Sequence, residues 1–279
     1  MGKPLRSGRV VYPRFLSKGL RVFTRAIVRP PATNFSEGLT TANLGAPNYE
    51  RAVAQQEAYC LALEQCGLTL TRLEPDQAYP DCPFVEDTAV LTDKCAVLTR
   101  PGALSRAGEV ASIKKVLTDF YSDMLSIQSP GTLDGGDVCE AGDHFFIGIS
   151  ERTNEAGAQQ LADLLAPSGY TCSFVDIRSL NDILHLKSGI AYLGDNRLVL
   201  IDALEHTDHA EFSKYDLVRL NVDEEYAANC VRINEHVLVA AGYPVLERKL
   251  RELGYQTIAL DMSEFQKMDG GLSCLSLRF

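Results

Sequence analysis

The sequence predicts an α/β protein that repeats one structural unit along the chain, as a propeller or a solenoid does. Three observations favour this class. β-Hairpin patterns recur with a period of roughly 40 to 50 residues, the range of propeller and solenoid repeats. Helical patterns alternate with the strands. The first strand pattern has no helix before it and the last has none after it. In a closed ring these two ends would complete one further unit and leave no sheet edge exposed.

The individual elements follow from apolar periodicity and from turn residues. A first strand is predicted over 22–28, a helix over 49–66 that ends at Gly67, and a strand over 68–73. Residues 32–48 lack periodicity and are predicted to form a long loop, which we interpret as a functional lid. An open doubly wound sheet is the alternative fold, but no glycine-rich nucleotide fingerprint follows the first strand. The remaining predictions are hairpins over 88–99, 138–149, 190–201 and 230–240, helices over 108–120, 154–166 and 244–253, a marginal helix over 205–214, and a last strand over 274–278.

Composition narrows the class of partner. The chain has 279 residues, of which 46% are hydrophobic, and a formal net charge of −10. This charge disfavours nucleic acid and favours a cationic small molecule. Eight scattered cysteines without a CxxC pair are typical of reduced thiols in the cytoplasm. No apolar run has the length of a membrane span. We therefore expect a cytoplasmic protein that binds a small molecule and neither nucleic acid nor a membrane.

The first 21 residues differ from the rest of the chain. They are basic, and no acid precedes Glu37. No apolar segment follows the first basic residues, so a secretory signal is not predicted. An organelle-targeting peptide has a similar composition, but we favour a disordered basic arm over 1–21, followed by a single catalytic domain over 22–279. Arg6 occupies the position at which a myristoylation signal has Ser or Thr.

A motif in the middle of the chain carries the first chemical signal. Residues 132–138, Thr-Leu-Asp-Gly-Gly-Asp-Val, place Asp134 and Asp137 on either side of a glycine pair. Glycines allow a sharp turn or a close approach of the backbone to another group. The alternative is a plain tight turn with solvated acids.

Histidine and cysteine supply candidate catalytic groups. His185 lies between apolar neighbours just before a strand, so it is either a core histidine or a general acid/base. His206 and His209 form an HxxH pattern, but their segment looks like a solvated loop, and no metal is predicted. Cys274 follows a Gly-Gly loop. A cysteine nucleophile needs a histidine and often a carboxylate, so Cys274, His185 and Asp134 could form such a set.

Six ordered segments resemble the dimethylarginine dimethylaminohydrolase family, and the likeness extends from about residue 22 to residue 279. They are PDCPFVEDTAV (80–90), LTRPGA (98–103), TLDGGDV (132–138), GISERTN (148–154), LHLKS (184–188) and KMDGGLSCLS (267–276). The resemblance implies a five-bladed α/β propeller of pseudo-symmetric ββαβ units. It also implies hydrolysis of Nω-methylated arginine to citrulline without a cofactor.

The resemblance also implies a role for each matching residue. Cys274 would be the nucleophile, His185 the general acid/base, and Asp134 the group that orients His185. The substrate-binding residues would be Asp81, Glu86 and Asp87 for the guanidinium and α-amino groups, Arg100 and Arg152 for the α-carboxylate, Leu39 in the lid, and Met268 and Asp269 through their backbone. At the position of Met268 the family pattern has another apolar residue, which matters little for a backbone contact.

Physical chemistry agrees with these implied roles. A methylated arginine is cationic at one end and zwitterionic at the other, which suits three acids and two arginines. Acids around Cys274 would raise the pKa of its thiol, so we expect a protonated thiol at neutral pH until a cation binds.

Three rival functions stay open from the sequence. Arginine deiminase, in the same superfamily, has an acid two residues after its catalytic histidine, whereas this chain has Lys187. That difference favours methylated arginine over arginine. A non-catalytic amino-acid sensor would be expected to lack Cys274 or His185. A plain scaffold would leave Cys274 no more reactive than the other cysteines.

Overall fold

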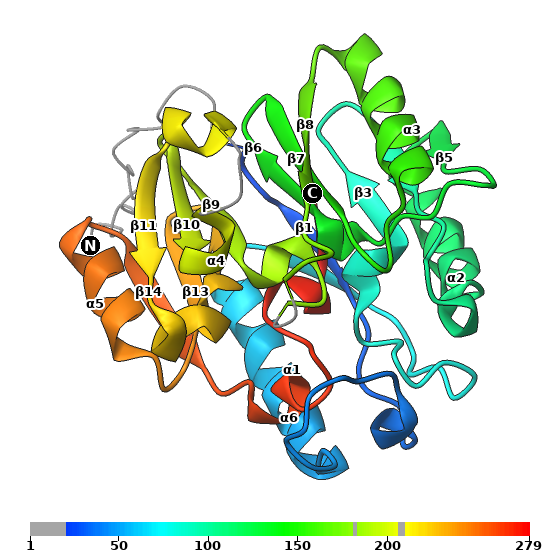
Figure 1. Cartoon of the computed structure of the whole chain (residues 1–279). Helices are drawn as coiled ribbons and strands as arrows, with labels where there is room; N and C mark the ends of the chain where they lie inside the picture. Colours follow the sequence, from blue (N-terminus) through cyan, green and yellow to red (C-terminus); the bar gives the residue numbers. More distant parts are fainter. Residues whose placement is uncertain (1–20, 181–182, 206–209) are drawn as a thin grey trace, which may run out of the picture.

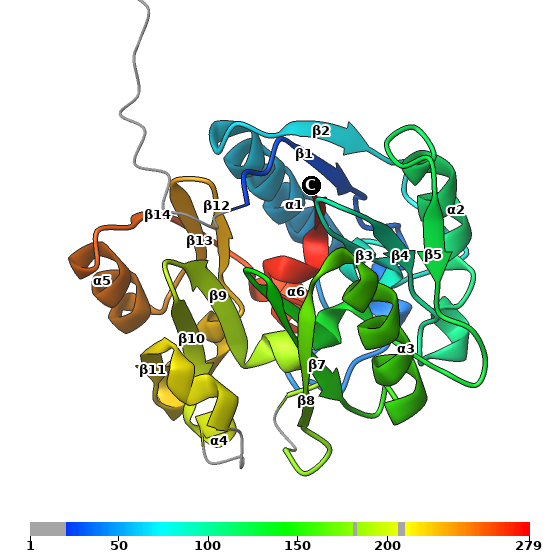
Figure 2. The same cartoon turned by 90° about the horizontal axis from the view of Figure 1, so that it is seen from above.

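The computed structural model describes residues 21–180, 183–205 and 210–279. Five three-stranded sheets make up the fold, and Figure 2 shows them arranged in a ring. In four of them the first strand pairs antiparallel with the second, and the second pairs parallel with the third across a crossover. The predicted α/β propeller of ββαβ units is therefore confirmed.

The fifth sheet joins the two ends of the chain. Strand β15 pairs antiparallel with β1, with Ala26 opposite Arg278, and β1 pairs parallel with β2. This confirms the prediction that the ends complete one unit together. The strands are β1 (Arg25–Val28), β2 (Thr69–Arg72), β3 (Ala89–Leu91), β4 (Ala96–Leu98), β5 (Met124–Ser126), β6 (Val138–Ala141), β7 (His144–Ile149), β8 (Thr171–Asp176), β9 (Ile190–Gly194), β10 (Arg197–Ile201), β11 (Asp216–Leu220), β12 (Val231–Ile233), β13 (His236–Ala240), β14 (Gln256–Leu260) and β15 (Leu277–Arg278).

In each unit a helix connects the two parallel strands and lies outside the sheet (Figure 1). The central strands β7, β10 and β13 are continuous apolar runs, because sheet neighbours and helices cover them on both faces. The α-helices are α1 (Tyr49–Gln65), α2 (Glu109–Leu117), α3 (Glu155–Leu165), α4 (Asp202–Glu205), α5 (Pro244–Glu252) and α6 (Ser263–Gln266). The 3₁₀ turns used below are η1 (Phe35–Glu37), η2 (Val85–Thr88), η4 (Gly135–Asp137), η6 (Leu186–Ser188), η7 (Ala210–Lys214) and η9 (Ser273–Leu275). Within the described residues, no helix is long and apolar enough to cross a bilayer.

The first strands of neighbouring units contact one another, as β15 does β3, β6 does β9 and β9 does β12. They enclose a cavity of about 380 Å³, which we call the rear cavity. Its wall includes Glu140, Lys187 and Arg278. The candidate active site is a different, smaller cavity.

Two predicted elements differ in the structure. The last strand is only Leu277–Arg278, and Cys274 lies in turn η9 instead of at a strand start. Ser273 donates its N–H to Asn229 and its hydroxyl to Glu86, and these two hydrogen bonds hold the turn away from strand geometry. Among the described residues of the third crossover, the four-residue α4 and turn η7 stand in place of the marginal helix predicted over 205–214. Of the predicted arm over 1–21, only Arg21 is described, and the HxxH motif at 206–209 lies outside the described residues.

Candidate active site

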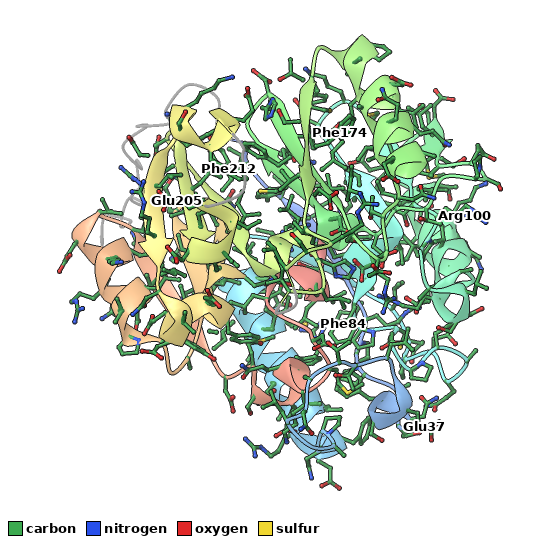
Figure 3. The ribbon with its side chains drawn as sticks, viewed as in Figure 1. Glu37, Phe84, Arg100, Phe174, Glu205 and Phe212 are labelled. Atoms are coloured by element: carbon green, nitrogen blue, oxygen red, sulfur yellow. The ribbon has the colours of Figure 1, made fainter. Side chains whose placement is uncertain are left out.

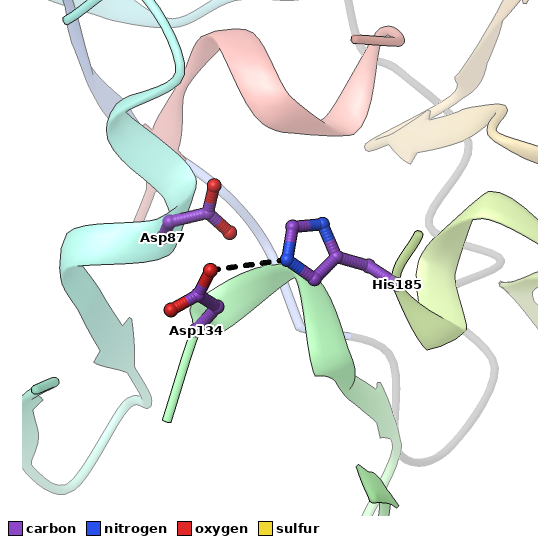
Figure 4. Close-up of side chains that lie close together, drawn as sticks. All are labelled: Asp87, Asp134 and His185. Carbon is purple, nitrogen blue, oxygen red and sulfur yellow. Dashed lines mark hydrogen bonds and ion pairs between the residues drawn. The ribbon is translucent and has the colours of Figure 1, made fainter. Parts of the chain in front are cut away.

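The Asp134–His185 pair is the centre of the site. Nε2 of His185 lies 3.1 Å from Oδ2 of Asp134, and both side chains are buried. The other oxygen of Asp134 accepts a hydrogen bond from the N–H of Gly102 at 2.8 Å. Figure 4 shows the carboxylate of Asp87 on the same side of the imidazole. Asp134 therefore contacts the His185 ring and is itself held by the backbone.

The glycine pair of the central motif makes this approach possible. The N–H of Gly136 donates to Oδ1 of Asp87 at 2.8 Å. A Cβ on Gly136 would lie 2.8 Å from the His185 ring, and one on Gly135 would lie 2.0 Å from the carbonyl oxygen of Glu86. Only a residue without a side chain fits at either position. The motif is therefore a close approach of backbone to catalytic groups, and not a solvated turn.

Cys274 and His185 line one small cavity of about 20 Å³. That volume holds about one water molecule. The cavity is far smaller than a methylated arginine, so substrate entry requires part of the wall to move. The other lining residues are Leu39, Asp81, Phe84, Asp87, Arg106, Arg152, Leu184, Met268, Asp269 and Gly270.

The thiol of Cys274 is poorly ionised in this setting. Burial raises its pKa, and the negative charges of Glu86 and Asp87 raise it further, to about 12. The sequence-based expectation of a raised thiol pKa agrees with this environment. A cation in the cavity would stabilise the thiolate and lower that pKa.

His185 is surrounded by acids. Burial alone would lower its pKa, but Asp87, Asp137 and the hydrogen-bonded Asp134 together raise it to about 9. Asp87 responds in the opposite direction. Burial would raise the pKa of Asp87, yet the charges of His185 and Arg106 lower it to about 2. The site therefore holds a protonated imidazole beside the ionised carboxylate of Asp87 at neutral pH.

Asp81 connects the cavity to the lid loop. Its two carboxylate oxygens accept from the N–H of Leu39 at 3.1 and 3.2 Å. Burial raises the pKa of Asp81, against the opposing charge of Arg106 and the Leu39 N–H. Asp269, on the other side of the cavity, accepts from the N–H of Thr41 at 2.5 Å and from its hydroxyl at 3.1 Å. The loop predicted as a lid is thus tied to both walls of the cavity.

Glu86 faces away from this cavity. Its Oε1 lies 2.6 Å from Nζ of Lys187 and 3.1 Å from a guanidinium nitrogen of Arg278. Its Oε2 accepts from the hydroxyl of Ser273 at 2.7 Å. Glu86 lines the rear cavity and is absent from the wall of the cavity that holds Cys274. Glu86 therefore holds turn η9, which carries Cys274, from the side of the rear cavity.

The structure corrects the placement of one arginine. Arg100, assigned to the substrate carboxylate from the sequence, donates to the carbonyl of Gly131 at 3.0 Å and does not line the cavity. Figure 3 places Arg100 at the outer edge of the view, away from Phe84 in the cavity wall. The isolated bridge between Arg100 and Leu133 holds it there. Arg152 does line the cavity, as do Met268 and Asp269.

Arg106 occupies the wall that Arg100 was expected to occupy. Its guanidinium donates to Oδ2 of Asp87 at 2.6 Å and to both oxygens of Glu109, at 3.0 and 2.8 Å. It also donates to the carbonyl of Phe84 at 3.0 Å. Arg100 and Arg106 flank the same short motif, so spacing could not separate them. The 3₁₀ turn at Leu104–Arg106 directs the side chain of Arg106 into the cavity wall.

The same carboxylates and imidazole have the geometry of a cation site. One ligand atom each from Asp87, Asp134 and His185 lies within 4.8 Å of the others. These atoms already hydrogen-bond or ion-pair among themselves and with Arg106. These three groups are therefore arranged to hold and transfer a proton among themselves.

Two curated relatives show the family of the chain. No protein-family model matches the chain. The dimethylarginine dimethylaminohydrolase of Pseudomonas aeruginosa is 44% identical over 259 residues, which are 92% of this chain and 100% of that protein. The enzyme of the same name from Streptomyces coelicolor is 35% identical over 257 residues, covering 91% of this chain and 96% of that protein.

A solved structure gives the same result. A cysteine-to-serine mutant of the Pseudomonas aeruginosa enzyme, complexed with citrulline, superposes with a TM-score of 0.89 and 42% identity. The match covers 93% of this chain and 100% of that one. A five-unit α/β propeller with a cysteine, a histidine and carboxylates in one inner cavity is the architecture of the guanidine-modifying enzymes. Within that class, the chain belongs to the dimethylarginine dimethylaminohydrolase family.

Proposed function

We propose that the protein hydrolyses Nω-methylated arginine to citrulline and a methylamine, with Cys274 as the nucleophile. The observation that carries this proposal is the composition of one buried cavity. Cys274, His185, Asp81 and Asp87 line it together with an arginine pair, Arg106 and Arg152. Relatives that match the chain over nine-tenths of its length bear the name of this activity.

The charges of the cavity suit this substrate. Ionised Asp87 would hold the guanidinium, because opposite charges at hydrogen-bond distance favour each other in a buried site. Asp81 would receive the α-amino group or a second guanidinium N–H. Arg152 would bind the α-carboxylate, and Arg106 would keep Asp87 ionised and in place. Leu39, Met268 and Asp269 would cover the substrate through lid and backbone contacts.

The reaction divides into two steps. The Cys274 thiol releases its proton to solvent when the cationic substrate binds, and the thiolate sulfur attacks the guanidinium carbon. His185 gives its proton to the methylated nitrogen, the C–N bond breaks, and the amine leaves a thiouronium on Cys274. His185 then takes a proton from water, and the hydroxide adds to the same carbon. The C–S bond breaks, the leaving thiolate takes the proton of the added hydroxyl group to become the thiol again, and citrulline is released. Asp134 keeps the imidazole aligned throughout.

Arginine deiminase activity is the alternative within the superfamily. Its pattern places an acid where this chain has Lys187, and Nζ of Lys187 pairs with Glu86. No acid at this position is available to hold an unsubstituted guanidinium, which favours a methylated one. A non-catalytic sensor is disfavoured because both Cys274 and His185 are present in the cavity wall.

The test is citrulline release from asymmetric dimethylarginine, monomethylarginine and arginine, offered separately to the wild type and to Cys274→Ser. We expect turnover of the methylated substrates alone, abolished in the mutant. Turnover of arginine instead would make the protein a deiminase. Absence of turnover for all three, in folded protein, would overturn the proposed function.

We further propose that residues 22–279 act as one catalytic domain in the cytoplasm, without a cofactor and without a nucleic-acid or membrane partner. The eight free cysteines support a reducing compartment. Fractionation of cells that express the full chain tests this location, and recovery of the protein in a membrane or organelle fraction would contradict it.

A further inference from the structure

Asp137, the second carboxylate of the central motif, has no part in the proposed reaction, yet it is fully buried. Its carboxylate accepts three hydrogen bonds. Oδ1 accepts from the N–H of Leu186 at 2.9 Å. Oδ2 accepts from the hydroxyl of Ser150 at 2.7 Å and from that of Thr153 at 2.6 Å. Burying a carboxylate costs free energy unless hydrogen bonds or opposite charges compensate it. A turn with a purely structural role would not need a buried carboxylate at this position.

These three donors belong to the segments that carry the site. Leu186 directly follows His185. Ser150 and Thr153 enclose Arg152, and the hydroxyl of Ser150 accepts from the N–H of Arg152 at 3.0 Å. The hydroxyl of Thr153 accepts from the N–H of Asp134 at 3.1 Å. One carboxylate therefore joins the loop of the general acid, the turn of a substrate-binding arginine and the residue that orients the imidazole.

We propose that Asp137 is a positioning residue for the reaction, whose carboxylate fixes the His185 loop and the Arg152 turn in one relative geometry. This rests on the proposed function, in which His185 moves the protons and Arg152 binds the substrate. Asp137 touches neither substrate nor reacting atoms, so it acts through the residues that it holds.

Hydrogen-bond polarity explains why the residue is an aspartate. The hydroxyl oxygen of Ser150 already accepts from the N–H groups of Arg152 and Thr153, at 3.0 and 3.1 Å. Its proton must therefore point to Asp137. An asparagine would keep one acceptor for Leu186 but would direct N–H groups against this donor. An isosteric Asp137→Asn change thus preserves the side-chain volume and breaks the hydrogen bonds from the hydroxyls of Ser150 and Thr153.

Asp137 also belongs to the charged groups that face His185. The others are Asp87 from η2, with Arg106 behind it, and Asp134 just before η4; the titratable thiol of Cys274 from η9 lines the same cavity. Burial raises the pKa of Asp137, and the charge of His185 with the hydroxyl donors opposes that rise. Loss of its carboxylate would loosen the His185 loop and remove one group that favours the imidazolium.

The experiment compares Asp137→Asn with Glu224→Gln. Glu224 is a matched control, because it is a buried carboxylate whose oxygens accept from two backbone N–H groups, those of Val245 at 3.2 Å and Leu246 at 2.9 Å. The titration of His185 is followed by NMR, with its signal identified by its loss in His185→Gln. kcat and KM are measured on asymmetric dimethylarginine.

We expect Asp137→Asn to lower the pKa of His185 by about one unit or more. We expect kcat to fall by about 10-fold or more, because misplaced catalytic groups lose rate steeply. Glu224→Gln should lose stability and change neither quantity. Folded Asp137→Asn with an unchanged His185 titration and kcat would overturn the proposal. If the wild type releases no citrulline, the proposed function fails, while the titration still tests the role of Asp137.

A second variant covers the case in which Asp137→Asn does not fold. A Cβ on Gly148 would lie 2.9 Å from Oδ1 of Asp137 and 2.9 Å from Cβ of Leu186. Gly148→Ala therefore adds a methyl group that pushes Asp137 and Leu186 apart without removing either hydrogen-bonding group. We expect the same direction of change in kcat and in the His185 titration. A folded Gly148→Ala protein with wild-type values of both would contradict the proposal.

Discussion

Asn229 holds Ser273, the residue before the nucleophile, with both ends of its side-chain amide. Its Oδ1 accepts from the Ser273 N–H at 2.8 Å, and its Nδ2 donates to the Ser273 hydroxyl at 3.1 Å. The same Nδ2 donates to the carbonyl of Lys187 at 3.0 Å, in the turn that follows His185. A Cβ on Gly271 would lie 2.6 Å from this amide, so the nucleophile loop packs directly on it. One side chain thus joins the His185 loop to the Cys274 loop.

Asn229→Asp should lower kcat by about 10-fold or more and leave KM nearly unchanged. The carboxylate keeps the acceptor for Ser273 but faces the carbonyl of Lys187 without a donor, which separates the two loops. Asn234→Asp is the control, since the Asn234 amide makes three hydrogen bonds to backbone groups and does not line the cavity that holds Cys274. Steady-state kinetics and urea unfolding of both variants check this. Equal kcat in the two variants would refute a link between the loops.

Arg106→Lys and Arg100→Lys should separate the two candidate arginines. A lysine at position 106 cannot span Asp87 and Glu109 as the guanidinium does. We expect kcat/KM to fall by about 10-fold or more, which corresponds to roughly 1.4 kcal/mol of transition-state stabilisation. Arg100→Lys should stay close to wild type, because its side chain bonds only the Gly131 carbonyl. The kinetic constants of both variants decide, and a larger loss for Arg100→Lys would restore the sequence-based assignment.

Periodicity and motifs predict the repeated units, the closure of the ring and the Cys274, His185 and Asp134 set, because these depend on local pattern and on long ordered segments. The direction in which a side chain points depends on tertiary packing. Arg100 lies in the LTRPGA segment and Arg106 three residues after it, and the 3₁₀ turn at Leu104–Arg106 decides which faces inward. Glu86 and Asp87 are neighbours, yet turn η2 sends them to opposite cavities. Asn229 lies in no recognised segment, so its contacts were invisible in the sequence.

The ligand-free thiol of Cys274 should be alkylated slowly at neutral pH. Burial and the charges of Glu86 and Asp87 raise its pKa to about 12. A bound cation such as L-lysine, used below saturation so that the thiol stays accessible, should shift the pH dependence of its alkylation to lower pH. The rate of iodoacetamide modification at Cys274 is followed by mass spectrometry from pH 6 to 11, with the other cysteines as internal controls. Coincident curves with and without the cation would contradict this prediction.

The stability of the protein should fall as pH rises from about 6.5 through about 9. The folded-state pKa of His185, about 9, lies above its unfolded value of 6.5. A group with a raised pKa stabilises the fold fully below the unfolded value and loses that contribution as pH passes the folded value. The free energy of unfolding in urea, measured for wild type and His185→Gln, isolates this contribution by difference. A difference that stays constant between pH 6 and 10 would show that His185 does not titrate as inferred.

Thr41→Val should weaken the closed lid. The change removes the hydroxyl bond to Asp269, at 3.1 Å, and keeps the N–H bond to the same oxygen. One such hydrogen bond contributes about 0.5–1 kcal/mol, which corresponds to a rise in KM of about 2- to 5-fold. Thr33→Val is the matched control, because Thr33 lies in the same loop and its hydroxyl bonds Gln77 instead.

Since the cavity of about 20 Å³ is too small for a methylated arginine, the lid must open in each turnover. If product release limits the rate, kcat of Thr41→Val should therefore rise while its KM also rises. Stopped-flow measurement of citrulline dissociation separates the two effects, and equal dissociation rates for Thr41→Val and Thr33→Val would show that Asp269 does not latch the lid.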